Sequence, residues 1–309
     1  MQSSKLHTRL MGSDFELIAT GATEAIANRR LEQGVAEIKR IESLLTVFSE
    51  TSVTAQLNAQ AGGTPLAVPA EVYQLLLRCN KISTITQGAF DITAGVLKKP
   101  FNFKYDHFTW PDDNAITQAM ACTGFQHITL LDHHRVQLKR AGMRIDFGAI
   151  GKGYAADRVK ALWIADGATS GVVNASGDLT AWGTQPDGGP WKVGIAHPDD
   201  PQQISLWLPV NNASVATSGN YEQYVERNGV RYSHNIDPRK GWPVPYMKSV
   251  TVVSPSAELS DALATAITVM GPAVGLNLVN QLPDIHCIII DGKNTIFQSD
   301  NIQIHAKAS

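Results

Sequence analysis

Amphipathic periodicity dominates the first half of the chain. Apolar residues recur there every three or four positions, which predicts one face of a helix. A long helix is expected after Thr23, a typical N-cap residue, and its apolar face comprises Leu31, Val35, Ile38, Ile41 and Leu45. Similar spacing predicts a helix between Pro69 and Gly88 and another from Gly151 to Ala165.

Shorter apolar and β-branched runs, typical of strands, dominate the second half. They lie at residues 172–174, 192–196, 204–210, 249–253 and 286–291. The Asn228-Gly229 pair predicts a β-hairpin, and residues 7–20 are expected to form one strand. Helices followed by strands predict the α+β class with a mainly antiparallel sheet. Because no linker or repeat interrupts the pattern, we expect one domain over residues 1–309, which can divide into two lobes with the active site between them.

Composition excludes several classes of protein. The net charge of −2 gives no broad basic surface, so no nucleic-acid partner is expected. Three widely spaced cysteines, Cys79, Cys122 and Cys287, argue against a disulfide framework or a cysteine zinc site. The most apolar stretch, 262–278, is interrupted by glycine and proline, so it predicts a buried helix and its exit and no membrane span.

The first ten residues lack the apolar core of a signal peptide. The chain as given is therefore expected to be cytoplasmic, or periplasmic if a leader has been removed.

A glycine-rich turn precedes the third predicted helix. Gly148, Gly151 and Gly153 fall within six residues, after Asp146. Glycine permits close backbone approach, and a helix start offers N–H groups to an anion. The spacing is not that of a dinucleotide-binding fingerprint, and alone it favours a structural turn over a phosphate site. The acid Asp178, which follows a predicted strand, is likewise typical of a turn.

Residues 216–241 concentrate groups that can carry protons. His234 precedes Asp237 by three positions, and a histidine near a carboxylate is a candidate general base. The alternative is a hydrogen-bonded structural histidine. A Ser–His–Asp hydrolase with Ser218 as nucleophile is also considered, although Ser218 lacks the G-x-S-x-G elbow of that class.

Asp261 and Thr265 stand four residues apart and share one face of a predicted helix. Ser260 is the candidate N-cap of this helix, and Gly271 is its candidate end. A carboxylate and a hydroxyl are hard oxygen donors that suit Mg²⁺. In an equally weighted alternative, Asp261 only favours the positive end of the helix and Thr265 bonds back to its own helix.

Taken together, these blocks resemble the ApbE family of FAD:protein FMN transferases. Seven segments match in the family's order and span about residues 11 to 270. They are MGS at 11–13, GAFDIT at 88–93, DFGAIGKGYAAD at 146–157, NASGD at 174–178, TSG at 217–219, HNIDP at 234–238 and DALAT at 261–265.

The resemblance implies a fold and a set of site residues. The fold would be α+β and ApbE-like (T-fold-like), with mixed, mainly antiparallel sheets and packed helices. Mg²⁺ would be held by Asp261, Thr265 and a backbone oxygen of Ala149, and His234 would activate the incoming hydroxyl. The positions implied to contact FAD are Met11, Phe48, Ala89, Phe90, Asp91, Asp146, Lys152, Ser218 and Ile236.

The implied reaction is the Mg²⁺-dependent transfer of FMN from FAD, the substrate, to a Thr or Ser hydroxyl of an acceptor flavoprotein, with release of AMP. The resemblance suggests an acceptor of the respiratory or reductase subunit type. Two alternatives stay open: a Mg²⁺-dependent FAD pyrophosphatase that gives FMN and AMP, and a flavin-binding protein without turnover.

Overall fold

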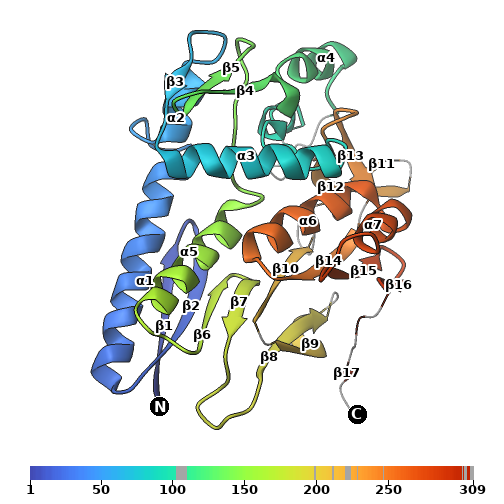
Figure 1. Cartoon of the computed structure of the whole chain (residues 1–309). Helices are drawn as coiled ribbons and strands as arrows, with labels where there is room; N and C mark the ends of the chain where they lie inside the picture. Colours follow the sequence, from blue (N-terminus) through green and yellow to red (C-terminus); the bar gives the residue numbers. More distant parts are fainter. Residues whose placement is uncertain are drawn as a thin grey trace.

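The centre of the molecule is an antiparallel sheet. The computed structural model describes residues 1–101, 110–197, 200–210, 212–219, 224–227, 229–245, 247–300, 302 and 305–306. Within them, eight strands pair in the order β1-β2-β6-β7-β10-β14-β15-β16 (Figure 1). They are β1 (Gln2–Leu10), β2 (Ser13–Gly21), β6 (Gly171–Ala175), β7 (Asp178–Trp182), β10 (Ala213–Gly219), β14 (Met247–Ser254), β15 (His286–Asp291) and β16 (Ile296–Gln298).

Helices cover one face of this sheet (Figure 1). They are α1 (Glu24–Leu45), α5 (Gly151–Ala165), α6 (Ala257–Met270) and α7 (Pro272–Val279). The other face packs against a second sheet, formed by β8 (Trp191–His197), β9 (Asp200–Val210) and β17 (His305–Ala306). Successive residues of β6 divide between the two faces: Val173 lies in the core with the helices, and Val172 packs with Trp191 of β8. This alternation is what the pleat of a strand dictates.

A further group of elements lies beyond α3 (Ala70–Ile85), which crosses the upper ends of α1 and α5 (Figure 1). This group comprises α2 (Val53–Ala59), η1 (Ala94–Lys98), α4 (Asp113–Ala121), η2 (Phe125–His127) and the sheet of β3 (Leu66–Ala67), β5 (Arg135–Leu138) and β4 (Ile128–Leu131). One hydrophobic cluster runs through α3, because it includes Leu75, Leu138 of β5, Leu17 of β2 and Trp163 of α5.

The predicted α+β class with mainly antiparallel sheets is confirmed, and so are the helices predicted after Thr23, between Pro69 and Gly88, and from Gly151 to Ala165. The predicted hairpin is also present: β11 (Tyr224–Arg227) pairs with β12 (Val230–Asp237), and Arg227 lies opposite Val230. Asn228 itself lies outside the described residues. β13 (Trp242–Pro245) completes this sheet.

The prediction of one strand over residues 7–20 is wrong. Met11 and Gly12 both have positive φ angles, 50° and 72°, and form a two-residue turn between β1 and β2. Positive φ at both central residues matches the right-handed twist of the paired strands, and glycine adopts it without strain. Met11 therefore stands at the tip of a hairpin.

The cysteines and the apolar helices were considered above for disulfides and for membrane spans. Cys79, Cys122 and Cys287 are free thiols in this structure. None of the described helices is both long and apolar enough to cross a membrane.

Candidate active site

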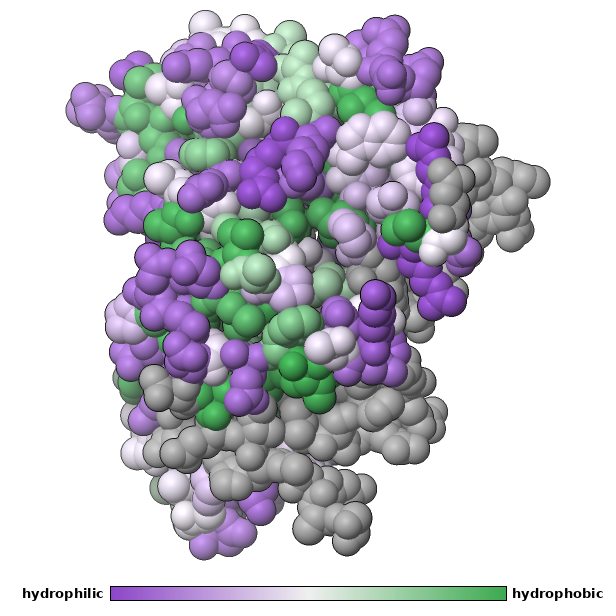
Figure 2. All heavy atoms as spheres, turned by 90° about the vertical axis from the view of Figure 1, so that its right-hand side faces the viewer, coloured by the Kyte–Doolittle hydropathy of each residue, from purple (hydrophilic) through white to green (hydrophobic). Residues whose placement is uncertain are grey.

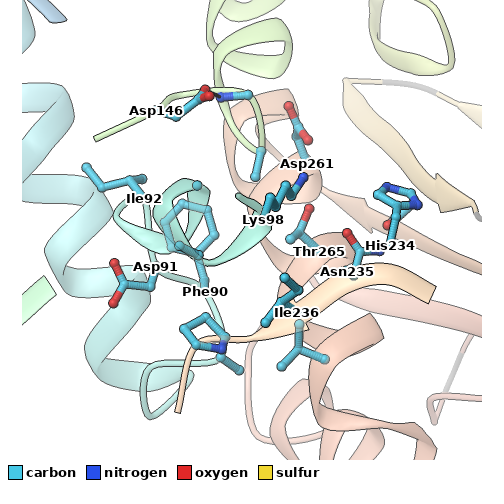
Figure 3. Close-up of a pocket in the computed structure, with 18 of the residues that line it drawn as sticks. Phe90, Asp91, Ile92, Lys98, Asp146, His234, Asn235, Ile236, Asp261 and Thr265 are labelled. Carbon is cyan, nitrogen blue, oxygen red and sulfur yellow. Dashed lines mark hydrogen bonds between the residues drawn. The ribbon is translucent and has the colours of Figure 1, made fainter. Parts of the chain in front are cut away.

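A cavity of about 430 Å³ opens where the segment after α3, the start of α5, β10, β12 and α6 meet. Most of the residues predicted from the sequence lie around it (Figure 3). Those in its lining are Ala89, Phe90, Asp91, Asp146, Ala149, Lys152, Ser218, His234, Ile236, Asp261 and Thr265. The chain thus brings together residues that are up to 176 positions apart (265 minus 89).

Met11 and Phe48 line a neighbouring pocket, which shares Asp146 and Lys152 with the first. Met11 reaches it from the β1–β2 turn, and Phe48 follows the end of α1. The Phe48 side chain is 95% exposed, although it is a large apolar group. An exposed aromatic ring at the mouth of a cavity is available to stack on a planar ligand.

Helix α6 begins one turn earlier than predicted. Ser256, and not Ser260, is its N-cap, and its hydroxyl accepts a hydrogen bond from Leu259 N at 3.3 Å. Ser260 lies inside the helix, where its hydroxyl bonds with Ser254 Oγ at 2.8 Å. The sequence offers serine at each of these positions, so only tertiary contacts decide which one caps the helix. Asp261 consequently sits in the second turn, with Thr265 one turn further on.

The glycine-rich turn serves a close contact between helices. Gly153 N donates to Asp261 Oδ2 at 3.3 Å. A Cβ atom at position 153 would lie 2.2 Å from the carbonyl oxygen of Ala257, so no side chain fits between α5 and α6. This contact supports the structural interpretation of Gly153, and it also places the start of α5 beside the Asp261 carboxylate.

Three ionisable side chains meet at this point, two buried acids and one partly buried lysine. Lys152 forms an ion pair with Asp178, and Asp261 lies near both. Burial raises the pKa of Asp261 to about 8, Asp178 adds to the rise, and Lys152 and the Gly153 N–H oppose it. Burial alone lowers the pKa of Lys152, but Asp178 and Asp261 raise it more, so the ammonium stays charged. The cavity therefore holds a carboxyl that one lysine, shared with Asp178, does not fully neutralise.

The oxygen donors of this cluster fit Mg²⁺. Asp261, Thr265 and Ala149 line one cavity. They carry a carboxylate, a hydroxyl and a backbone carbonyl, and such hard oxygens are the donors that Mg²⁺ prefers. A raised carboxyl pKa fits as well, because a divalent cation can take the place of the proton. No group of three His, Cys, Asp or Glu side chains forms a metal cluster in the described part of the chain.

The segment that follows α3 is held to the rest of the site by hydrogen bonds. Asp146 N donates to Ile92 O at 2.8 Å. The Asp91 carboxylate accepts from Thr93 N at 2.8 Å and Phe125 N at 2.8 Å, and it points away from Asp261 (Figure 3). Asp91 thus shapes the loop, and its expected contact with flavin stays a prediction.

His234 lies on β12 and lines the cavity together with Ser218 of β10. Asp237, three residues further on, does not serve it: its carboxylate accepts from Arg239 Nε at 2.8 Å and from Arg239 Nη2 at 2.9 Å. This pair closes the turn between β12 and β13. Asp237 therefore does not supply the carboxylate of a Ser–His–Asp hydrolase built on Ser218.

Two charged residues of the cavity lining, Lys98 and Asp178, were not predicted as site residues. Lys98, at the end of η1, points toward Asp261 (Figure 3). Nothing in its sequence surroundings distinguishes it from the adjacent Lys99. Asp178 was noticed only as part of a turn, and its burial beside Lys152 could not be inferred from spacing.

Several known proteins are similar to this chain. A sequence model of the ApbE family matches residues 11–289. The chain is 34% identical over 276 residues to a protein of Treponema pallidum named FAD:protein FMN transferase, which covers 84% of this chain and 76% of that protein. It is 33% identical over 294 residues to a Klebsiella pneumoniae protein of the same name, with 94% and 90% covered.

Solved structures show the same fold. The ApbE protein of Thermotoga maritima has a TM-score of 0.86 and 29% identity, with 97% of both chains covered. The flavinyl transferase ApbE of Pseudomonas stutzeri, in its apo form, has a TM-score of 0.85 and 28% identity, with 97% of this chain and 95% of that chain covered.

Proposed function

Because the chain belongs to the ApbE family, we propose that it transfers the FMN half of FAD to a Thr or Ser hydroxyl of an acceptor flavoprotein, with Mg²⁺ bound and with release of AMP. The coarser activity, FAD:protein FMN transfer with a protein as acceptor, rests on relatives 25–34% identical over most of the chain. The finer proposal concerns the metal, the accepting hydroxyl and the products.

The observation that carries the proposal is the placement of Asp261 and Thr265 in the same cavity as His234. Asp261, Thr265 and the carbonyl oxygen of Ala149 would hold the metal. Bound Mg²⁺ supplies Lewis-acid charge neutralisation to a pyrophosphate. Lys152, at the start of α5, adds a cation on the same side of the cavity.

His234 supplies the base. In the transfer, the acceptor oxygen forms a bond to the FMN phosphorus, and the bond from that phosphorus to the AMP oxygen breaks. The hydroxyl proton leaves to His234, and AMP departs with the electron pair. Positioned general bases typically contribute about 10²- to 10⁴-fold to such a step.

The test is an incubation with FAD and Mg²⁺, with and without an acceptor protein of the respiratory or reductase subunit type. Flavin fluorescence retained on the denatured acceptor, together with AMP, is the expected result. Free FMN and AMP without any labelled acceptor would make the protein a pyrophosphatase. FAD that stays intact under both conditions would leave only flavin binding.

A metal control completes the test. EDTA and Asp261→Ala are each expected to stop AMP release, because both remove the proposed Mg²⁺ site. Circular dichroism of Asp261→Ala checks that the fold is retained. Turnover that survives EDTA at the rate seen with Mg²⁺ would refute the metal dependence.

A further inference from the structure

The first turn of α6 is held by a side chain from α5. Asp157 Oδ2 accepts hydrogen bonds from Ser256 Oγ at 2.8 Å and from Glu258 N at 2.9 Å, and Asp157 Oδ1 accepts from Ala257 N at 3.0 Å. Backbone N–H groups in the first turn of a helix have no partner within the helix. Asp157 therefore caps a helix to which it does not belong, beside the helix's own N-cap.

Asp157 and Gly153 lie on one face of α5, because they are four residues apart. Along that face α5 meets α6 at two successive levels. Asp157 contacts the first turn of α6, and Gly153 N–H reaches Asp261 in the second turn. Between the two levels, the Cα of Gly153 faces the carbonyl group of Ala257 without room for a methyl group.

We propose that Asp157 is a positioning residue for Asp261. It holds the start of α6 against α5 at the separation that lets Gly153 N–H reach the Asp261 carboxylate. The carboxylate is thereby aimed at the cavity wall formed by Ala149 and Lys152. The consequence for metal binding rests on the function proposed above, whereas the consequence for the helix contact does not.

Loss of the Asp157 carboxylate leaves Ala257 N and Glu258 N without their partners, so the first turn of α6 loosens. The Asp261 side chain then has no fixed distance to Gly153. Partners that orient a metal ligand from outside the coordination sphere typically change metal affinity about 10- to 100-fold when removed. The same range is expected here.

Asp157→Ala provides the main test, with two measurements. Amide hydrogen exchange of the metal-free protein is expected to be roughly tenfold faster or more at Gly153 and in the first turn of α6. The Mg²⁺ concentration for half-maximal FAD cleavage is expected to rise about 10- to 100-fold, while kcat at saturating Mg²⁺ falls less. Asp157→Asn, which keeps one acceptor oxygen, is expected to lie between Asp157→Ala and the unaltered protein.

Thr23→Ala is the matched control. It removes another helix cap, the Thr23 hydroxyl that accepts from Ile26 N at 3.3 Å, at the end of α1 away from the cavity. An equal shift in Mg²⁺ half-saturation in Thr23→Ala would show a general effect of stability and overturn the proposal. So would unchanged exchange at Gly153, or an unchanged Mg²⁺ half-saturation, in Asp157→Ala. If that variant does not fold, Asp157→Asn is judged by the same criteria.

The two proposals fail in different ways. If the rate of FAD cleavage by the unaltered protein does not depend on the Mg²⁺ concentration, the proposed role of Mg²⁺ is refuted. The expected effect of Asp157 on metal binding is then refuted as well. The helix contact is judged separately, because the exchange at Gly153 is measured without metal and without FAD.

Discussion

The surroundings of the Asp261 carboxyl group disfavour its ionised form. It is buried, it lies near a second acid, Asp178, and the lysine beside it already pairs with that acid. A group of this kind is costly to ionise unless another cation arrives. Lys152 and the Gly153 N–H partly offset the cost of ionising Asp261, because both lower its pKa. Such unresolved charge is typical of functional sites.

Mg²⁺ binding is therefore expected to depend on pH. Burial raises the pKa of Asp261 to about 8, so a proton occupies the carboxyl at lower pH and the metal must displace it. Between pH 6 and pH 7, the Mg²⁺ concentration for half-maximal FAD cleavage should fall by up to about tenfold. Measuring this value at each pH, at fixed ionic strength, checks the prediction. A half-saturation that stays flat from pH 6 to pH 8 would contradict it.

Asp261→Asn is expected to stabilise the metal-free protein at alkaline pH. Because the folded pKa of about 8 lies above the ordinary value of 3.8, this carboxyl contributes stability that is full below pH 3.8, decreases as pH rises from there, and is gone above about pH 8. Asn has no charge to bury, so the variant should gain on the order of 1–2 kcal/mol over the unaltered protein at pH 9. Thermal melts in EDTA at pH 6 and pH 9 test this, and an equal difference at both pH values would count against it.

The sequence indicated which residues meet in the cavity better than it indicated what each one does. His234 and Asp261 were both identified, but the carboxylate assigned to His234 pairs with Arg239 instead. Asp178 was assigned to a turn, although it is a buried partner of Lys152. Spacing along the chain states which residues share a face of one element. It does not show which side chain of another element will contact a given residue, and that contact decides what the residue does.

At the scale of elements, α6 is held from two sides. Asp157 of α5 caps it, and Arg78 of α3 pairs with Glu258 in its first turn, with 2.6 Å between Nε and Oε1. Burial raises the pKa of Glu258, and Arg78 lowers it. The Arg78 guanidinium also lies over the Tyr154 ring, 5.6 Å from its centroid. The helix that carries Asp261 is thus fixed to α5 and to α3 by side-chain contacts.

Arg78→Ala should destabilise the protein, because Glu258 then stays buried without a cation. Arg78 is partly exposed, so water screens the pair and the expected loss is about 1–2 kcal/mol, less than for a fully buried pair. The loss should be smaller at pH 5 than at pH 8, since protonation relieves the unpaired Glu258. Urea unfolding of Arg78→Ala and of Arg78→Ala with Glu258→Gln tests this. The second change should recover part of the loss, and no recovery would argue against the pair.

Helices and strands were predicted correctly where the local sequence pattern determines them. The prediction failed where the structure depends on pairing between distant segments. The bounds of α5 agree with the predicted 151–165 because periodicity and the glycine turn lie within the segment itself. The order of the central sheet was not predictable, since β2 pairs with β6 across some 150 residues. The β1–β2 turn was missed because Met11 gives no turn signal of its own, and only Gly12 does.

At the scale of the whole molecule, the cavity is assembled from segments that are remote in sequence. Figure 2 shows the face on the right-hand side of Figure 1, where hydrophobic and hydrophilic residues are interspersed among the described atoms. The cavity walls come from the segment after α3, from the central sheet, from β12 and from two helices. A ligand that touches all of these walls ties the central sheet to the elements beyond α3.

FAD together with Mg²⁺ should therefore stabilise the whole fold. At about one hundred times its dissociation constant, a ligand adds about 2.7 kcal/mol, or roughly 5 °C in Tm for a chain of this size. Differential scanning fluorimetry with FAD, Mg²⁺, or both checks this, and AMP in place of FAD serves as a control for partial occupancy of the site. A Tm that does not move with FAD at any concentration would contradict binding in this cavity.

Substitutions at Gly153 can change the distance between α5 and α6 in one direction only. The two helices already touch through main-chain atoms, with 2.2 Å between the site of a missing Cβ and the Ala257 oxygen. A substitution can push the helices apart, but none can draw them closer than their backbones allow. The separation of the two helices at the proposed Mg²⁺ site can consequently be increased, but not decreased, by substitutions at this position. Mg²⁺ binds oxygen at about 2.0–2.1 Å and Ca²⁺ at about 2.3–2.6 Å, so substitutions at residue 153 are expected to shift the proposed site only toward the larger ion.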